Sequence, residues 1–337
     1  MRLGENFLRR QAVRLTALVL VVGAYGLARV PAAPEEELAR LAARFRFSAA
    51  PLPTLEGETP KTIREVNPSL RRIAGWVSAV GAAVALHDLD ADGLPNDICY
   101  VDTRIDRVVV APAPGTPPRY VPFSLDARPL PYDASTTAPM GCLPGDFDED
   151  GRTDLLAYYW GRTPVVFLRQ AAGPLAAASY QPHELVGTSE RWFTNAATQA
   201  DIDGDGHTDL VIGNYFPDGA RILDARSTVP DEMQESMSLA SNGGGPRFLI
   251  RKRPAPASHA PFAFEDVRGL LEGRAARGWT LAVAAGDLDG DLLPELYLAN
   301  DFGPDRLLHN RSAPGAPRFA LAEGRRGLTT PKSKVVG

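Results

Sequence analysis

Hydrophobic and polar positions follow a repeated order along most of the chain. From about Gly75 onward, each unit has a run of small apolar residues, an acidic loop, a short apolar strand, a polar turn and a further strand. The acidic loops begin at Asp88, Asp146, Asp201 and Asp287, which lie 58, 55 and 86 residues apart. Short strands that recur between turns at a nearly fixed period predict an all-β fold, a β-propeller whose blades are antiparallel sheets.

The sequence also predicts where the strands of each unit lie. The strand after the loop reads "ICYVD", "LLAYYW", "LVIGNY" or "LYLAND", and the further strand reads "RVVVAP", "PVVFLR", "ARILD" or "DRLLHN". The third interval is longer, and residues 227–261 within it are rich in Ser, Gly and Pro. This composition predicts a flexible surface insertion, after which regular structure resumes at "FAFEDV". The blades are therefore expected to occupy residues 75–337.

The first 33 residues are typical of an export signal. Four arginines precede an apolar run, residues 15–28, whose 14 residues are short for a membrane span and suit a signal-peptide core. Small residues at Ala32 and Ala33 offer a cleavage site, whereas Arg29 and Pro31 are unusual there, so that an uncleaved membrane anchor is the alternative. In both cases the rest of the chain is expected to be exported, either secreted or at the cell surface.

Residues 34–74 are predicted to form a linker or stalk between this signal and the blades. The sequence "EEELARLAARF" at residues 35–45 has a helical spacing of apolar positions, so a short helix is expected there. A proline-rich stretch follows at residues 51–60.

The net charge and the cysteine count bear on nucleic-acid binding and on disulfide formation. The net charge of -5 gives no electrostatic case for nucleic acid, so no nucleic-acid partner is expected. The two cysteines, Cys99 and Cys142, can form one disulfide in an exported chain, and two free buried thiols are the alternative.

The acidic loops have the chemistry of calcium sites. Three carboxylates on alternate residues of a tight loop repel one another, and a hard divalent cation reverses the sign of that interaction. Calcium takes about six to eight oxygen ligands, whereas magnesium demands stricter geometry and retains its water. A glycine after the third carboxylate permits the turn through a positive φ. The seventh residue then offers its backbone carbonyl oxygen, and the ninth returns a carboxylate.

About four calcium sites are expected from this pattern. In the first loop the predicted ligands are Asp88, Asp90, Asp92 and the carbonyl of Leu94, with either Asn96 or Asp97 closing the loop. In the second they are Asp146, Asp148, Asp150, the carbonyl of Arg152, and Asp154. In the third they are Asp201, Asp203, Asp205, the carbonyl of His207, and Asp209. In the fourth they are Asp287, Asp289, Asp291, the carbonyl of Leu293, and Glu295; there Leu292 replaces the turn glycine, so the fourth site is expected to be the least regular.

These loops and strands resemble FG-GAP/VCBS repeats, the calcium-bearing blades of integrin-α-type propellers. Residues 286–310, "GDLDGDLLPELYLANDFGPDRLLHN", and the sequence after them resemble more narrowly the ASPIC/UnbV group of bacterial proteins related to cartilage acidic protein 1. The resemblance covers about three quarters of the chain, from Gly75 to the end. It implies roughly seven blades in a closed propeller, so four loops lead us to expect that the chain is incomplete.

Two classes of function fit this resemblance. The first is a non-enzymatic binding or adhesion module for an extracellular protein or glycan, and the second is a propeller-based hydrolase or lyase acting on an extracellular polymer. The five histidines form no metalloprotease spacing, and the sequence has no GxSxG or Walker motif. Nearly all clustered carboxylates already belong to the loops, so the binding module is favoured and no catalytic residue is predicted. The aromatic residues 158–160 and 215–216 are expected in the core between blades, or alternatively along a carbohydrate or protein groove at a blade rim.

Overall fold

The computed structural model describes residues 2–28, 34–45, 47–170, 173–187, 190–254 and 260–322. The chain divides into two compact units, Met1–Pro51 and Leu52–Gly337. The first unit contains helices α1 (Arg2–Ala28) and α2 (Glu35–Ala42). Within the described ranges, no helix combines the length and the apolar character needed to cross a membrane. The expected cleavage site at Ala32 and Ala33 lies outside the described residues.

The second unit is built from four antiparallel sheets of four strands each within the described residues, and we call these sheets blades 1 to 4. Blade 1 comprises β1 (Val84–His87), β2 (Asp97–Asp102), β3 (Arg107–Pro112) and β4 (Phe123–Ser124); blade 2 comprises β5 (Ala138–Gly145), β6 (Asp154–Trp160), β7 (Val165–Arg169) and β8 (Tyr180–Glu184). Blade 3 comprises β9 (Thr194–Ala200), β10 (Asp209–Asn214), β11 (Gly245–Lys252) and β12 (Ala263–Val267); blade 4 comprises β13 (Trp279–Gly286), β14 (Glu295–Asp301), β15 (Arg306–Asn310) and β16 (Phe319–Leu321). The unit also contains the short helices η1 (Pro68–Ile73), α3 (Ala74–Ala79), η2 (Ala177–Ser179) and η3 (Ala275–Arg277).

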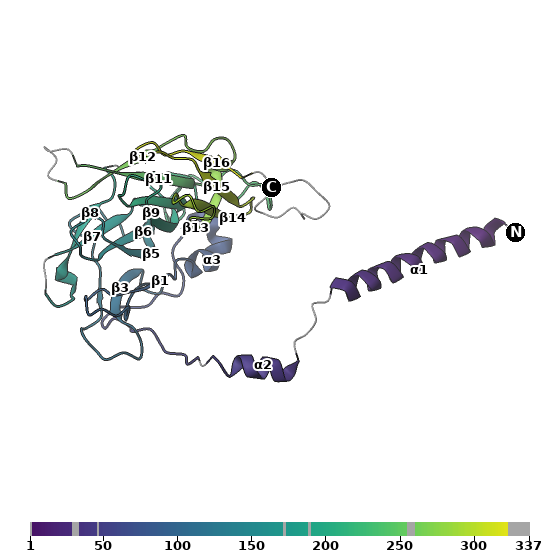
Figure 1. Cartoon of the computed structure of the whole chain (residues 1–337), viewed down its shortest axis with the longest axis horizontal. Coiled ribbons are helices and arrows are strands. Elements are labelled where there is room, and N and C mark those ends of the chain that lie inside the picture. Colours follow the sequence, from purple (N-terminus) through teal and green to yellow (C-terminus); the bar gives the residue numbers. More distant parts are fainter. Residues whose placement is uncertain are drawn as a thin grey trace. The chain divides into compact units, whose positions relative to one another are not determined.

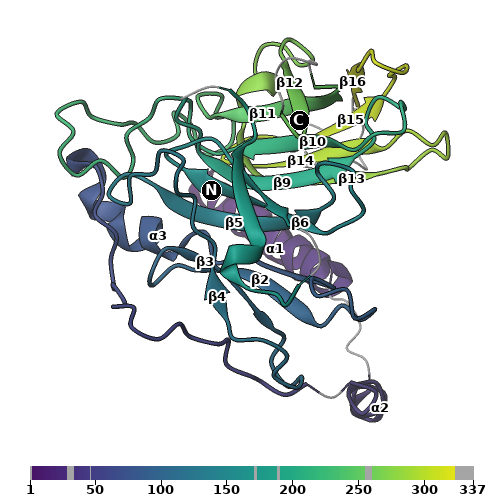
Figure 2. The ribbon, with the colours of Figure 1, turned by 90° about the vertical axis from the view of Figure 1, so that its left-hand side faces the viewer.

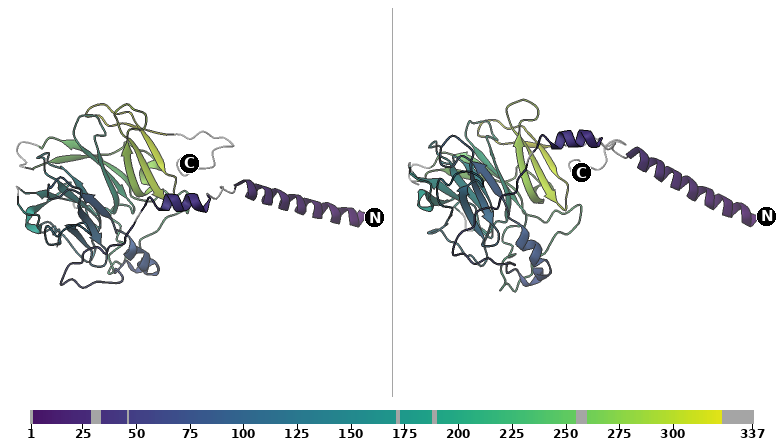
Figure 3. Two further views of the ribbon diagram at one scale, coloured as in Figure 1. Left: turned by 60° about the horizontal axis from the view of Figure 1, so that its bottom comes forward. Right: turned by 90° about the horizontal axis from the view of Figure 1, so that it is seen from below.

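The blades follow one another in sequence order (Figures 1 and 2). The first strands β1, β5, β9 and β13 bring neighbouring blades together, since β5 contacts β1 and β9, and β9 contacts β13. Figure 3 shows the same succession from blue to yellow. Small residues in the first strands permit this close approach: a Cβ on Gly145 of β5 would lie 2.3 Å from Gln199 Oε1 of β9. The prediction of an all-β, propeller-like fold is therefore confirmed for the described residues.

Blade 3 corrects the predicted strand "ARILD" and the bounds of the predicted insertion, residues 227–261. Its third strand is β11, Gly245–Lys252, which pairs with both β10 and β12. The insertion therefore lies between β10 and β11. Ile222 and Leu223 of "ARILD" are buried in turns, where the carbonyl of Ile222 accepts a hydrogen bond from the amide of Asn67 at 2.8 Å. The prediction was wrong because an apolar segment can fill the core without joining a sheet.

The predicted linker, residues 34–74, is also too long. Val66 and Leu70 are buried in the same apolar cluster as Val77 of α3. Arg64 is 4% exposed, and its guanidinium is hydrogen-bonded to Asp106 and to the carbonyl of Val77. Residues after about Leu52 therefore belong to the propeller unit. The sequence prediction missed this because the segment is mostly polar and only a few of its residues, such as Arg64, Val66 and Leu70, are buried.

An aromatic core joins blades 2 to 4. Trp160, Phe216 and Trp279 are fully buried, and the ring centroid of Phe216 lies 5.1 Å from that of Trp160 and 5.2 Å from that of Trp279. Tyr215 is 1% exposed and packs 5.0 Å from Trp279. These rings fill the space between blades, so the expected inter-blade core is correct and the alternative of a carbohydrate or protein groove at a blade rim is not.

A disulfide joins Cys99 of β2 to Cys142 of β5. It connects blade 1 to blade 2 and closes a sequence separation of 43 residues. Both cysteines are buried in an apolar cluster shared by the two blades.

Candidate metal centres

All four acidic loops form the hairpin between the first and second strands of a blade. In each case the residue before the loop pairs with the residue that closes it. The pairs are His87 with Asp97, Gly145 with Asp154, Ala200 with Asp209, and Gly286 with Glu295. The loops therefore occupy equivalent positions in the four blades.

The backbone takes a similar turn in each loop. The sixth residue has a positive φ throughout, 87° at Gly93, 83° at Gly151 and 89° at Gly206. Leu292 holds this place in the fourth loop with a φ of 72°. A side chain in the left-handed region costs about 1–2 kcal/mol. The fourth loop thus adopts the turn at a cost that the glycines avoid.

Carboxylates hold the turn through backbone amides. Asp201 Oδ1 accepts from the amide of Asp205 at 3.1 Å, and Asp201 Oδ2 accepts from that of Gly206 at 2.9 Å. The fifth residue accepts from the amide of the seventh at 2.9 Å in every loop. These pairs are Asp92 with Leu94, Asp150 with Arg152, Asp205 with His207, and Asp291 with Leu293. A ligand role for the seventh residue therefore falls to its carbonyl oxygen.

The closing carboxylate links the loop to the rest of its blade. Asp209 is fully buried; its Oδ2 accepts from the amide of Ile202 at 3.0 Å and its Oδ1 from that of Arg251 on β11 at 2.7 Å. Asp154 and Glu295 make the equivalent two bonds in blades 2 and 4. Burial raises the pKa of Asp154 and of Asp209 from 3.8 to about 7. These two carboxylates are therefore costly to ionise unless a cation lies beside them.

In the first loop, Asp97 and not Asn96 takes the closing position. Asp97 Oδ2 accepts from the amide of Leu89 at 2.8 Å, as Asp209 does from that of Ile202. Asn96 is the extra residue of this loop, and its Nδ2 donates to Asp92 Oδ2 at 3.0 Å.

The third loop has the arrangement that best fits a cation. Side-chain oxygens of Asp201, Asp203 and Asp209 lie within 4.8 Å of one another, whereas Asp205 is not part of this group. Asp203 is 0% exposed, and its Oδ2 meets no hydrogen-bond donor in the described part of the chain. Burial, followed by the charge of Asp205, raises the pKa of Asp203. A buried carboxylate oxygen without a donor is rare in folded proteins, and a bound ion is one of the ordinary explanations.

The second loop repeats this arrangement in a more exposed form. Side-chain oxygens of Asp146, Asp148 and Asp154 lie within 4.8 Å of one another. Asp148 Oδ1 is buried and likewise meets no donor among the residues described. Asp150 lies outside this group and forms an ion pair with Arg152.

An arginine that the sequence analysis missed lies against the first loop. The Nε of Arg119 donates to Asp90 Oδ2 at 2.6 Å and lies 3.6 Å from Asp92 Oδ2, and Nη2 pairs with Asp97 Oδ1. Nη2 also donates to the carbonyl of Asn96 at 3.0 Å. Asp88, Asp90 and Asp92 still form a cluster, but the guanidinium supplies part of the positive charge that a metal would bring.

The fourth loop is the most exposed. Asp287, Asp289 and Asp291 cluster at the surface, and Glu295 is outside that group. Arg311 Nη1 lies 3.5 Å from Asp289 Oδ2 and 3.8 Å from Asp291 Oδ2. Glu295 instead groups with Asp289 and His309, a residue that the sequence analysis did not select.

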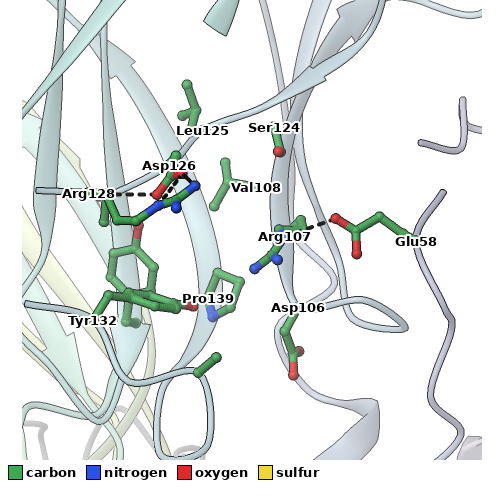
Figure 4. Close-up of a pocket in the computed structure, with 13 residues that line it drawn as sticks. Glu58, Asp106, Arg107, Val108, Ser124, Leu125, Asp126, Arg128, Tyr132 and Pro139 are labelled. Atoms are coloured by element: carbon green, nitrogen blue, oxygen red, sulfur yellow. Dashed lines mark hydrogen bonds and ion pairs between the residues drawn. The ribbon is translucent and has the colours of Figure 1, made fainter. Parts of the chain in front are cut away.

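Away from the loops, a polar pocket of about 450 Å³ lies between blades 1 and 2. Figure 4 shows Glu58 and Arg107 on one side of it, and Asp126, Arg128 and Tyr132 on the other. The charged side chains that line the pocket are paired. Glu58 lies 3.4 Å from Arg107, Asp126 accepts from Arg128 at 2.8 Å, and Asp106 accepts from Arg64 at 2.6 Å.

Comparison with known proteins supports the repeat assignment. Residues 146–212 match the FG-GAP-like repeat family, and this range contains the second and third acidic loops in full. A search of the curated proteins found no match for the chain. The match and the four equivalent blades together support FG-GAP-like repeats in a propeller-like, all-β fold.

Proposed function

We propose that this protein is an exported, calcium-stabilised propeller that binds an extracellular protein or glycan and catalyses no reaction. The observation that carries the calcium assignment is the fully buried Asp203, whose Oδ2 meets no donor in the described residues, inside a cluster with Asp201 and Asp209. A calcium ion supplies the missing partner and offsets most of the negative charge of the three carboxylates. It requires only oxygen ligands, which the loop provides.

In this proposal the metal has a structural role. Asp209 already joins the third loop to β11 through the amide of Arg251. A cation shared by Asp201, Asp203 and Asp209 therefore ties the start of β10 to the loop and to the third strand at once. Binding to the folded state alone stabilises it by mass action, about 2.7 kcal/mol when free calcium is 100 times Kd.

The four loops are expected to differ in affinity. The second and third loops have buried carboxylate oxygens that meet no donor among the described residues. Arg119 and Arg311 lie against the first and fourth loops and compete with a cation there. Isothermal titration of the metal-free full chain with calcium is expected to give two tight sites, one of which is lost in Asp203→Asn and retained in the control Asp126→Asn. Titration heat equal to buffer dilution would refute the calcium assignment.

The absence of catalysis is proposed from the loops and the pocket. The loop carboxylates are assigned to backbone amides and to the proposed cations, and the charged groups lining the pocket of Figure 4 are held in ion pairs. A hydrolase or lyase needs an acid and a base that are free to exchange protons with a substrate. Incubating the protein with extracellular polysaccharides and measuring new reducing ends or unsaturated products is expected to show no turnover. Turnover that depends on Asp126 or Tyr132 would favour the enzyme instead.

Binding is tested on arrays of glycans and extracellular proteins. A specific signal in calcium that falls in chelator and in Asp203→Asn is the expected result. A signal that no chelator changes would separate the binding activity from the metal.

Export is proposed from residues 1–33. Fusing residues 1–51 to a phosphatase that is active only outside the cytoplasm is expected to give activity, and deleting residues 15–28 is expected to abolish it. Equal activity with and without that run would contradict export by this segment.

A further inference from the structure

Blade 4 contains a second group of potential metal ligands that includes a nitrogen. One side-chain atom each of Asp289, Glu295 and His309 lie within 4.8 Å of one another. The Nδ1 atom of His309 is 3.9 Å from Glu295 Oε1. Asp289 comes from the fourth loop, Glu295 closes that loop, and His309 lies on β15. The group therefore combines two carboxylates and an imidazole from the loop and the third strand of one blade.

The imidazole nitrogen lacks an ordinary partner. His309 Nδ1 is buried and makes no hydrogen bond to any residue that the structure describes, and Glu295 beside it has a fully buried side chain. A buried polar atom without a partner needs an explanation, and a bound ion is one. The His309 side chain as a whole is 38% exposed, so the group is open to solvent on one side.

The equivalent positions of blades 2 and 3 hold no polar group. The closing carboxylate accepts from the amide of Arg169 in blade 2, of Arg251 in blade 3 and of Asn310 in blade 4. The residues that precede these three are Leu168, Ile250 and His309. Leu168 and Ile250 are buried in apolar clusters. Blades 2, 3 and 4 therefore share the closing carboxylate and its amide donor, and of these three only blade 4 adds an imidazole. That imidazole, His309, lies beside Glu295, the carboxylate that closes the fourth loop.

We propose that blade 4 binds a borderline divalent transition metal, of which zinc is the test case, through Asp289, Glu295 and His309 Nδ1. This inference deepens the proposed function, because it assigns a different ion to one of the four loops. Imidazole nitrogen suits zinc and its neighbours, whereas calcium prefers oxygen alone. Zinc with three protein ligands and a water has metal–ligand bonds of about 2.0–2.2 Å. Tetrahedral geometry then places ligand atoms about 3.4 Å apart, so the 3.9 Å between His309 and Glu295 needs to close only slightly.

The guanidinium of Arg311 competes with zinc for the carboxylate of Asp289. Its Nη1 lies 3.5 Å from Asp289 Oδ2, and its side chain is 47% exposed. A long exposed side chain can move into solvent at little cost, because exposed ion pairs contribute little to stability. Arg311 therefore weakens zinc binding without preventing it.

The test is a zinc titration of the full chain, freed of metals and then saturated with calcium. One zinc ion per chain is expected to bind without displacing calcium. His309→Leu, which places the residue of blade 2 at this position, is expected to weaken zinc binding at least tenfold and to leave the calcium isotherm unchanged. Asp289→Asn, at an exposed side chain, is expected to weaken zinc similarly, which covers the case that His309→Leu folds poorly. Asp203→Asn is the matched control in the third loop and is expected to retain zinc.

The outcomes separate this inference from the calcium proposal. Zinc affinity that is unchanged in His309→Leu and Asp289→Asn, or zinc that excess calcium displaces, overturns the inference while calcium binding at the other loops can still stand. Zinc binding that depends on His309 supports the inference, and it does so even if the calcium titration shows no binding.

Discussion

Replacing Asp203 with asparagine has opposite expected effects with and without calcium. In the metal-free protein, Asp203 is a fully buried carboxylate near Asp201 and Asp205, and its Oδ2 meets no donor among the described residues. Asparagine has nearly the same size, carries no charge, and offers an NH₂ group to the neighbouring carboxylates. Asp203→Asn is therefore expected to be at least as stable as the parent in chelator.

In calcium the parent is instead expected to be more stable than Asp203→Asn. If free calcium is 100 times Kd, the parent gains about 2.7 kcal/mol at this site. For a domain of this size, that gain raises Tm by about 4–5 °C. The variant lacks one anionic ligand and is expected to lose most of this gain, while the other loops still respond.

The assay is thermal unfolding of both proteins in chelator and in calcium. Asp126→Asn is the control, because it removes a half-exposed carboxylate paired with Arg128 outside the loops, a change worth about 0–1 kcal/mol in either condition. A variant that is destabilised in chelator and retains the full calcium shift would refute the assignment of Asp203 as a ligand.

Three further predictions concern the first loop, the disulfide and pH. Arg119→Gln removes the guanidinium that pairs with the first loop, so it is expected to lower stability in chelator and to add one calcium site by titration; unchanged stoichiometry contradicts this. Cys99→Ser with Cys142→Ser removes the link between blades 1 and 2, and loop-closure entropy predicts a loss of about 4 kcal/mol in urea unfolding without reductant. The pKa of Asp154 and of Asp209 is raised from 3.8 to about 7 in the folded protein, so their contribution to stability in chelator is fully present below about pH 3.8 and is lost as pH rises through about 7. Saturating calcium is expected to abolish this loss. Equal pH profiles with and without calcium would argue against cation binding at these two residues.

Local patterns in the sequence predicted the blades and loops well. Each loop carries its turn residue and carboxylates within nine or ten positions, and the strand that follows is apolar, so little depends on distant residues. The β10 strand and the third loop, for example, lie where "DIDGDGHTDLVIGN" indicated. Even Leu292, which departs from the glycine pattern, adopts a positive φ because the rest of its loop determines the turn.

Long-range pairing was what the sequence did not reveal. Arg119 is 22 residues beyond Asp97, and His309 is 14 beyond Glu295; each reaches a loop only because of how its blade is assembled. Similarly, "ARILD" has the apolar content of a strand, but its Ile222 packs beside Asn67 from far upstream. Nothing in the local pattern distinguishes an apolar segment that packs into the core as a turn from one that forms a strand.

The most direct test of calcium binding is an anomalous difference map from crystals grown in calcium. We predict a peak in the third loop, about 2.3–2.6 Å from oxygens of Asp201, Asp203 and Asp209, and a second peak in the loop that begins at Asp146. A third loop with no peak, in which Asp203 Oδ2 is bonded to water or protein, would contradict the account.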